Sequence, residues 1–332
     1  MGSYRLIDPP LSRTQADYDR ISEKLLNLLA KQPGLCSLYA LGNVSEPGIS
    51  DLDLLCVFED NIHCSLQISS LLSAEERYLL PHAPFASSLR NLDAALNQTY
   101  FTNFKLLSGT DVIQEKGLHE NKSADLKQQI ALEFILIFYI SLHRQIQLKN
   151  VKWRGFLLSC KALKFDLQLL NIHTGPIHSL VEECIQLRQQ FFTYSLHEAE
   201  TKSRQLIEQV YKECRLFLSE TLHELPFFLP QAQFQIARNI SIVKSDHFQV
   251  KQQGFSLPGL FSFGGKYYHK IENRFSNFEF HVPYQLPAPG SKQEERFAKL
   301  SEIRCEQQSF FPNFIPLSTG FNFFYGQPCR SN

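Results

Sequence analysis

The sequence has no excess of charge of either sign, because its 33 lysines and arginines balance 33 aspartates and glutamates over 332 residues. Proteins that bind nucleic acid across a broad face need a surplus of Lys and Arg to neutralise the phosphates. The balance therefore argues against a binder of extended nucleic acid, although a small basic pocket remains compatible with it.

Long apolar runs are also missing. The longest, at 134–140, is bracketed by Glu133 and His143 and falls well short of the ~20 residues that cross a bilayer. The first residues lack the apolar core of a signal peptide. These absences predict no membrane span and a cytoplasmic location.

The sequence further lacks any C-x-x-C pair, any metal-ligand spacing among its eight cysteines, and any internal repeat. Several cysteines lie within apolar patterns, so we expect buried, reduced thiols rather than disulfides. Solenoids and propellers are excluded by the absence of repeats. The length and the 43% of hydrophobic residues suit two domains, or three small ones, with real cores.

The pattern of apolar residues changes along the chain. Helical spacing over 12–31, with Ser12 and Gln15 as a candidate capping box, predicts an amphipathic helix. Two short runs with β character follow at 36–41 and 52–58, separated by a loop rich in Gly, Ser and Pro. The expected order is helix, strand, loop, strand.

Weaker signals continue this first part of the chain. Ser73 and Glu76 fit the cap of a short helix, and residues 99–107 alternate as a third strand would. Long helical periodicity then runs over 123–225, which predicts a separate helical domain. Beyond it the sequence is rich in Phe and Pro and poor in regular pattern, so we expect loops with some β structure.

Two aspartates are the candidate metal ligands in the first part of the chain. Asp51 and Asp53 stand two residues apart in a predicted strand, so their side chains project from one face, ~6.6 Å apart. Leu52 and Leu54 then enter the core on the other face. Mg²⁺ is commonly held by one or two carboxylates together with substrate phosphates, and the pair predicts such a site.

The loop before this strand could bind the phosphates that would accompany a metal ion. Gly42 lets the backbone approach a phosphate closely, and Asn43 and Ser45 add amide and side-chain donors. One end of the segment is therefore expected to bind phosphate, and the other to bind a metal ion.

In this arrangement the sequence resembles the nucleotidyltransferase superfamily, which has the polymerase-β-like fold. Its motif is a Gly-Ser at the end of the first strand and an Asp-x-Asp followed by apolar residues on the second. Here the motif reads Gly42-Asn43 and then SDLDLL from Ser50 to Leu55. The resemblance covers about 14–115, with sharp support over 38–58.

The resemblance implies a reaction and a role for each motif residue. Asp51 and Asp53 would bind Mg²⁺, or Mn²⁺, bridging the triphosphate of a nucleoside triphosphate, with ATP as the expected donor. Gly42 and Asn43 would touch its β- and γ-phosphates. A nucleoside monophosphate would pass to a hydroxyl of a small molecule or protein, with release of pyrophosphate.

The sequence departs from the family's pattern in three respects. Asn43 replaces the usual Ser, and Glu46 lies where several relatives have a basic residue. The third carboxylate of the family has no clear place, since 99–107 holds none and Asp93 and Asp111 lack the right context. A degenerate member that serves as a nucleotide-binding or interaction module is the alternative. A glycosyltransferase D-x-D motif ranks third, because only one strand precedes it.

Basic residues of the helical domain offer a further phosphate site. Arg154 and Lys161 stand seven residues apart, hence on one helix face, and fit a clamp for the triphosphate. An ordinary solvated face is the competing interpretation. His82, flanked by prolines, is a candidate acid or base near the site, against the alternative of a plain loop histidine.

These signals predict an α+β fold in three parts. Residues 1–115 form a nucleotidyltransferase-like domain with a small mixed sheet, and residues 116–225 form a helical domain. Residues 226–332 form a Phe- and Pro-rich, partly β segment that packs on the other two.

Overall fold

The computed structural model describes residues 4–98, 101, 103–115, 122–230, 234–237, 240–243, 247–252, 267, 271 and 278–317. This part of the chain combines helices with small sheets, as the predicted α+β class requires. It forms two compact units. The sheet unit comprises 11–123 and 295–322, and the helical unit comprises the N-terminal residues up to 10 together with 124–294.

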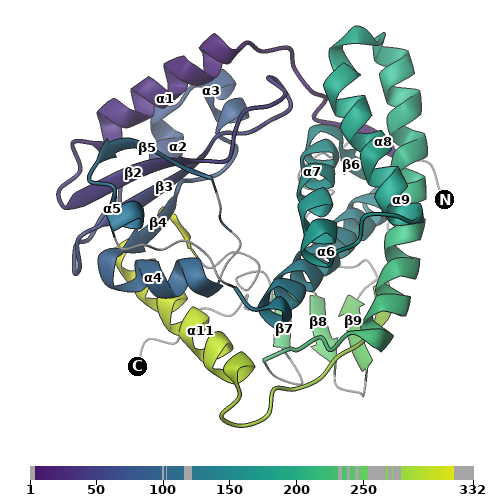
Figure 1. Cartoon of the computed structure of the whole chain (residues 1–332). Helices are drawn as coiled ribbons and strands as arrows, with labels where there is room; N and C mark the ends of the chain where they lie inside the picture. Colours follow the sequence, from purple (N-terminus) through teal and green to yellow (C-terminus); the bar gives the residue numbers. More distant parts are fainter. Residues whose placement is uncertain are drawn as a thin grey trace. The chain divides into compact units, whose positions relative to one another are not determined.

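The sheet unit is built on five strands in the order β11-β4-β3-β2-β5 (Figure 1). The strands are β2 (Leu35–Leu41), β3 (Asp53–Phe58), β4 (Phe85–Ser88), β5 (Phe104–Gly109) and β11 (Ile315–Pro316). Strand β2 is antiparallel to both β3 and β5, whereas β4 runs parallel to β3 and to β11. The sheet is therefore mixed, as predicted for this part of the chain.

Helices cover both faces of this sheet, with α1 on one side and α4 and α11 on the other (Figure 1). The first face carries α1 (Gln15–Leu29), α2 (Ile68–Leu71) and α3 (Ala74–Leu79), and the second carries α4 (Leu89–Gln98), α5 (Val112–Glu115) and α11 (Lys292–Phe310). Strand β3 serves both cores, since Leu54 and Cys56 face α1 while Leu55 and Val57 face α4.

Two predicted helix starts can be compared with the structure. The Ser73–Glu76 capping box of α3 is confirmed, and the Ser73 hydroxyl accepts the Glu76 N–H. The capping box of α1 was placed wrongly at Ser12 and Gln15. It consists of Thr14 and Asp17, whose carboxylate accepts the Thr14 N–H at 2.9 Å. The helix cap therefore lies two residues later than predicted.

The third strand was predicted over 99–107 but spans Phe104–Gly109. Asn103 has a positive φ of 57°, which breaks the extended conformation just before Phe104. Residues 99, 100 and 102 lie outside the described part of the chain. The strand is thus displaced toward its C-terminal end.

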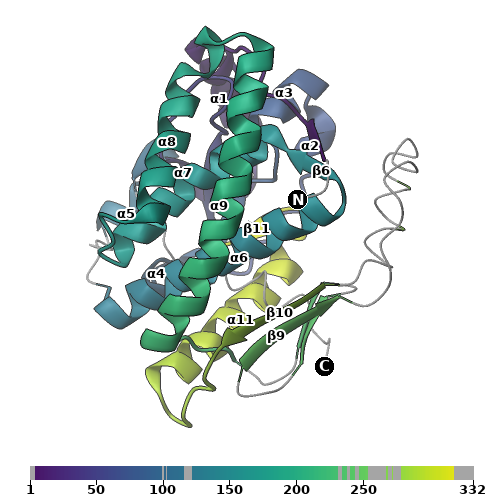
Figure 2. The ribbon, with the colours of Figure 1, turned by 90° about the vertical axis from the view of Figure 1, so that its right-hand side faces the viewer.

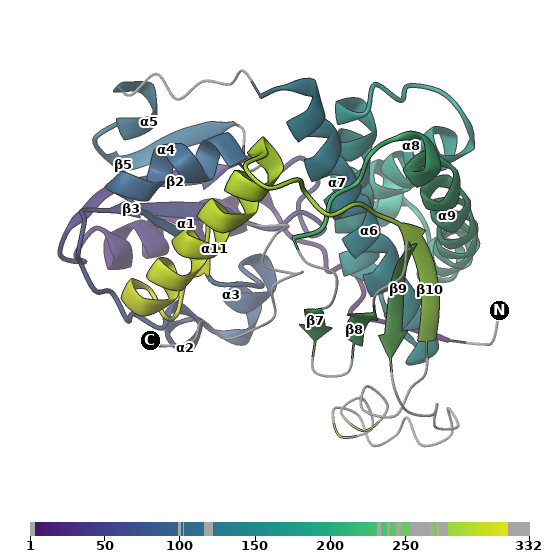
Figure 3. The ribbon, with the colours of Figure 1, turned by 90° about the horizontal axis from the view of Figure 1, so that it is seen from below.

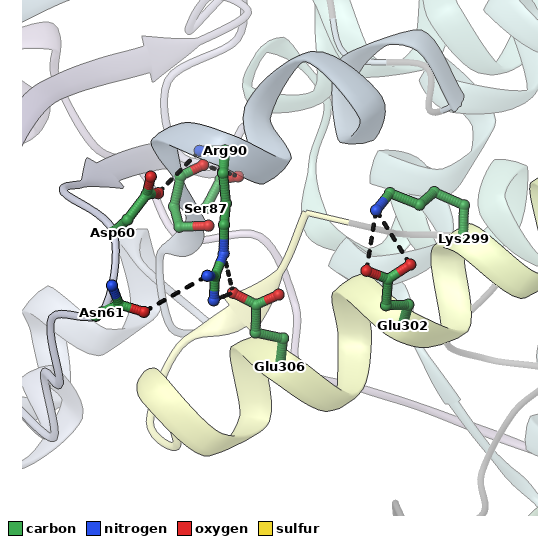
Figure 4. A network of polar contacts seen from close by, with 8 residues as sticks. Asp60, Asn61, Ser87, Arg90, Lys299, Glu302 and Glu306 are labelled. Carbon is green, nitrogen blue, oxygen red and sulfur yellow. Dashed lines mark hydrogen bonds and ion pairs between the residues drawn. The ribbon is translucent and has the colours of Figure 1, made fainter.

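Helix α11 is the largest element that the sequence analysis missed, because its region was expected to consist of loops and β structure. It runs for 19 residues from Lys292 to Phe310 and lies beside α4 (Figures 1 and 3). Arg90 of α4 forms an ion pair with Glu306 of α11, and its backbone N–H donates to Asp60 at the end of β3 (Figure 4). The ion pair links α11 to α4, and Ile303 of α11 packs in the same core as α4.

The helical unit is a four-helix bundle in which each helix packs against the next and α9 closes on α6 (Figure 2). Its helices are α6 (Ala124–Gln147), α7 (Trp153–Leu169), α8 (Pro176–Gln190) and α9 (Leu196–Glu224), with the short helix η1 (Phe191–Thr193) before α9. A pair of short parallel strands, β1 (Arg5–Ile7) and β6 (Asn150–Lys152), is attached to the bundle. The helical periodicity predicted over 123–225 is confirmed by these four helices.

The predicted third segment is divided between the two units. An antiparallel sheet in the order β10-β9-β8-β7 belongs to the helical unit (Figure 3). Its strands are β7 (Phe234–Ala237), β8 (Ile240–Val243), β9 (His247–Gln252) and β10 (Phe278–Pro283). Helix α11 and strand β11 return to the sheet unit instead. Residues from near the end of the chain therefore complete the sheet unit.

Two expectations from composition can also be checked. Six cysteines are free thiols, and all but Cys36 among them are buried, as expected. Cys305 is disulfide-bonded, against that expectation, and Cys329 lies outside the described residues. Among the described helices, none has the length and apolarity that a membrane crossing requires.

Candidate functional site

The two aspartates lie at the edge of the sheet where β2 ends and β3 begins. Asp53 is the first residue of β3 and pairs with Leu41, the last residue of β2. Strand β4 is parallel to β3, with Phe85 opposite Leu55, so the residues just before β4 reach the same edge. This edge therefore collects side chains from three separate segments.

Leu52 and Leu54 explain why both aspartates face outward. Both leucines are buried in the core beneath α1, and the Leu52 N–H donates to the Leu79 carbonyl at 2.9 Å. Because neighbouring side chains of an extended segment alternate in direction, burial of the leucines turns Asp51 and Asp53 to the opposite side. The predicted convergence of the two carboxylates follows from this anchoring.

Two tyrosines hold the loop that leads into the aspartates. The Tyr18 hydroxyl donates to the Ser50 carbonyl at 2.6 Å and accepts the Gly48 N–H at 3.0 Å. The Tyr78 hydroxyl donates to the Gly48 carbonyl. Since Tyr18 is fully buried in α1, the loop is fixed to the rigid part of the unit directly before Asp51.

Asp51, Asp53 and His82 form a cluster at this edge. One potential ligand atom from each of the three residues lies within 4.8 Å of the other two. All three side chains are partly exposed. In the described part of the chain this is the one group of three or more such residues that could hold a metal ion. Sequence reasoning paired the aspartates correctly, but considered His82 only as an acid or base.

His82 is held in a defined orientation. Its Nε2 lies 2.8 Å from Asp53 Oδ1, and its Nδ1 lies 2.9 Å from the Ala83 carbonyl oxygen. A carbonyl oxygen can only accept, so Nδ1 carries a proton and Nε2 is the atom that faces the carboxylates. The ring also contacts Phe85 edge to face, with 5.5 Å between centroids.

The carboxylates change the protonation of this histidine. Burial lowers the pKa of His82, but the hydrogen bond and charge of Asp53, the Ala83 carbonyl and the charge of Asp51 outweigh burial and raise the pKa to about 9. Without a cation, His82 is therefore protonated at neutral pH and paired with Asp53. A metal ion that binds through Nε2 must displace that proton.

The predicted phosphate loop is open but partly engaged. Gly42 has a positive φ of 65°, and a Cβ at this position would meet nothing within 4 Å. Its N–H donates to the Asn103 carbonyl at 3.1 Å, so this amide serves the sheet rather than a ligand. Asn43 and Ser45 are exposed, and the Ser45 hydroxyl donates to Glu46. Among the described residues, the space beside the Cα of Gly42 is therefore open.

Asp93 and Asp111, the two candidates for the family's third carboxylate, both lie away from Asp51 and Asp53. Asp111 follows β5 at the opposite end of the sheet, where it accepts the Tyr39 hydroxyl at 3.1 Å. Asp93 lies on α4 and accepts the Asn97 amide at 2.6 Å. Within the described residues, His82 is the third potential metal ligand beside the two aspartates.

The predicted clamp residues both lie on α7, in the helical unit. Arg154 is 3% exposed, and its backbone N–H donates to the Asp8 carbonyl at 3.1 Å. Lys161 is partly buried. Arg154 does not belong to a solvated face, and the role of the two residues at a triphosphate stays a prediction.

No protein-family model matches this sequence, and a comparison with curated proteins found no match. The resemblance to nucleotidyltransferases accordingly depends on the sequence motif.

Proposed function

We propose that the chain is a divalent-cation-dependent nucleotidyltransferase. It transfers a nucleoside monophosphate from a nucleoside triphosphate, ATP in the first instance, to a hydroxyl of a small molecule or protein, and releases pyrophosphate. The observation that supports this most is the convergence of Asp51 and Asp53 at the start of β3. They follow an open glycine loop in a helix-strand-loop-strand order, which is the context of the motif.

The donor set fits a divalent cation. Two carboxylates and one imidazole nitrogen can approach a common point, and all three side chains reach solvent. A bound cation would neutralise charge on the transferring phosphoryl group and orient it for in-line attack. Asp51, Asp53 and His82 are the residues that would hold it.

The chain's own contribution is positioning. Leu52 and the tyrosines of α1 and α3 fix the direction of the two carboxylates, and the Ala83 carbonyl fixes the ring of His82. Groups fixed in this way lose little freedom when substrate binds, which favours reaction. The open surface above Gly42 is where the triphosphate would lie.

A degenerate relative that binds nucleotide without turnover is the second candidate. It is favoured by one observation: among the described residues no third carboxylate joins the pair. Since the third carboxylate of the family helps to deprotonate the acceptor, its absence would slow the chemical step more than nucleotide binding.

Both candidates can be tested together. The purified chain is incubated with each α-labelled nucleoside triphosphate, Mg²⁺ or Mn²⁺ and a panel of hydroxyl acceptors, and label transfer and pyrophosphate are measured. We expect both signals to be lost in Asp51→Asn and Asp53→Asn but kept in Asp93→Asn, a matched control on the exposed side of α4. Cation-dependent nucleotide binding without pyrophosphate identifies the second candidate. Activity that survives loss of both motif aspartates refutes the assignment.

A further inference from the structure

We infer that the site formed by Asp51, Asp53 and His82 selects a divalent transition-metal ion with affinity for nitrogen, such as Zn²⁺, over Mg²⁺. The inference rests on the proposed function, because it concerns the cation that the same site would use. It goes beyond that function by naming the class of metal and the residue that determines the choice.

The site offers two kinds of donor atom, carboxylate oxygens from Asp51 and Asp53 and an imidazole nitrogen from His82. Mg²⁺ prefers six oxygen ligands in near-ideal octahedral geometry, and carboxylates and water satisfy it. Imidazole nitrogen suits Zn²⁺, Cu²⁺, Fe²⁺ and Ni²⁺ instead. An Asp-Asp-His set resembles the mixed nitrogen and oxygen sites in which three protein ligands hold Zn²⁺. Replacing a third carboxylate by His82 therefore moves the preference of the site away from Mg²⁺.

The distances are compatible with one shared ion. Ligands bind Zn²⁺ at about 2.0–2.2 Å, so two atoms on the same ion are at most about 4.4 Å apart. The three candidate ligand atoms already lie within 4.8 Å of one another, and His82 Nε2 is 2.8 Å from Asp53 Oδ1. The three atoms therefore lie close to the spacing that one shared ion requires.

The orientation of His82 is a second and independent observation. Metal-binding histidines almost always donate their other ring N–H to a carbonyl or carboxylate, which fixes the tautomer. His82 does this through Nδ1 to the Ala83 carbonyl at 2.9 Å, and its ring also packs against Phe85. Phe85 in turn contacts Phe101, with 4.8 Å between centroids. The ring is thus held with Nε2 toward the aspartates before any ion binds.

The exposure of the ligands indicates the type of site. The side chains of His82 and Asp53 are 31% and 34% exposed, whereas structural zinc sites are closed by four protein ligands. Three protein ligands at an open surface leave a position for water or a substrate oxygen. That is the arrangement of a catalytic site.

The test is calorimetric titration of the full chain with ZnCl₂, MnCl₂ or MgCl₂ alone, without nucleotide and at one fixed pH. The variant Asp51→Asn/Asp53→Asn measures cation binding at all other positions, including free thiols, and is subtracted. His82→Asp rebuilds an all-carboxylate site. His63→Asp is the matched control, because His63 is exposed in a loop of the same unit.

We expect the ratio of Zn²⁺ to Mg²⁺ affinity to fall at least about tenfold in His82→Asp and to stay unchanged in His63→Asp. An unchanged ratio in a folded His82→Asp variant, checked by circular dichroism, overturns the inference. So does wild-type binding no stronger than that of the double variant.

Failure of the inference is distinguishable from failure of the proposed function. Selective Zn²⁺ binding without transfer of label would remove the proposed function and leave the metal preference intact. Transfer supported by Mg²⁺, with an affinity ratio that His82→Asp does not change, would overturn the metal preference alone.

Discussion

The stability of the helical unit should depend on pH through His143. This residue lies on α6 with 7% of its surface exposed, and its Nδ1 is 2.7 Å from the hydroxyl of Tyr211 on α9. Tyr139 stacks on Tyr211 beside it. Burial, with a smaller contribution from the charge of Arg215, lowers the pKa of His143 to about 4. The native bundle therefore keeps this imidazole neutral.

The size and sign of the effect follow from that pKa. The unfolded chain binds the proton with a pKa near 6.5 and the folded chain with a pKa of about 4. This difference corresponds to about 3 kcal/mol, since each pKa unit is worth about 1.4 kcal/mol. The folded state binds the proton more weakly, so this stability is fully present above pH 6.5 and is lost as pH falls toward 4.

The assay is urea unfolding followed by the fluorescence of Trp153, the single tryptophan, which is buried in α7 of the same unit. Wild type is compared with His143→Gln, whose side chain does not titrate, at about pH 7 and about pH 4. We expect wild type to lose up to about 3 kcal/mol more than the variant on acidification. Equal losses in the two proteins would refute the reasoning. His63→Gln, an exposed histidine, should behave as wild type.

Three further predictions concern the sheet unit. In metal-free Asp53→Asn, prepared with a chelator, the pKa of His82 should fall from about 9 to near or below 6.5, as measured by NMR of the ring. A pKa that stays near 9 would show that Asp53 is not the main cause of the raised pKa. Glu306→Ala should lower the free energy of unfolding, measured with a chemical denaturant, by at most about 1 kcal/mol, because its ion pair is near the surface. Ile303→Ala on the same helix should lower it by about 2–5 kcal/mol, because Ile303 is fully buried. Equal decreases would contradict the packing of α11 described above. Tyr18→Phe should weaken cation binding measured by calorimetry while the unit stays folded, since it removes two hydrogen bonds to the loop; unchanged affinity would show that the loop does not position the ligands.

The aspartate pair could be predicted because its geometry is local. Alternation along the extended segment that leads into β3 places Asp51 and Asp53 on the same face whatever the rest of the fold does. His82 could not be assigned as their partner in the same way. It reaches them through the parallel pairing of β3 with β4, with Leu55 opposite Phe85, and pairing between distant segments leaves no periodic signal in the sequence.

Helix α11 was not predicted for a different reason. Its apolar residues Phe297, Leu300 and Ile303 are buried and spaced three apart, which is a helical signal within the sequence. The many Phe and Pro residues on either side conceal it, because they dominate the composition of the whole segment. The position of α11 in the sheet unit depends on core packing against α4, which no local sequence pattern reveals.

In a crystal structure with a non-hydrolysable ATP analogue and Mn²⁺, anomalous scattering would locate the ion independently of the chain. We expect an ion bound by Asp51, Asp53 and His82, with the phosphates above the loop that starts at Gly42. A fully occupied nucleotide whose ion and phosphates lie away from these residues would contradict it.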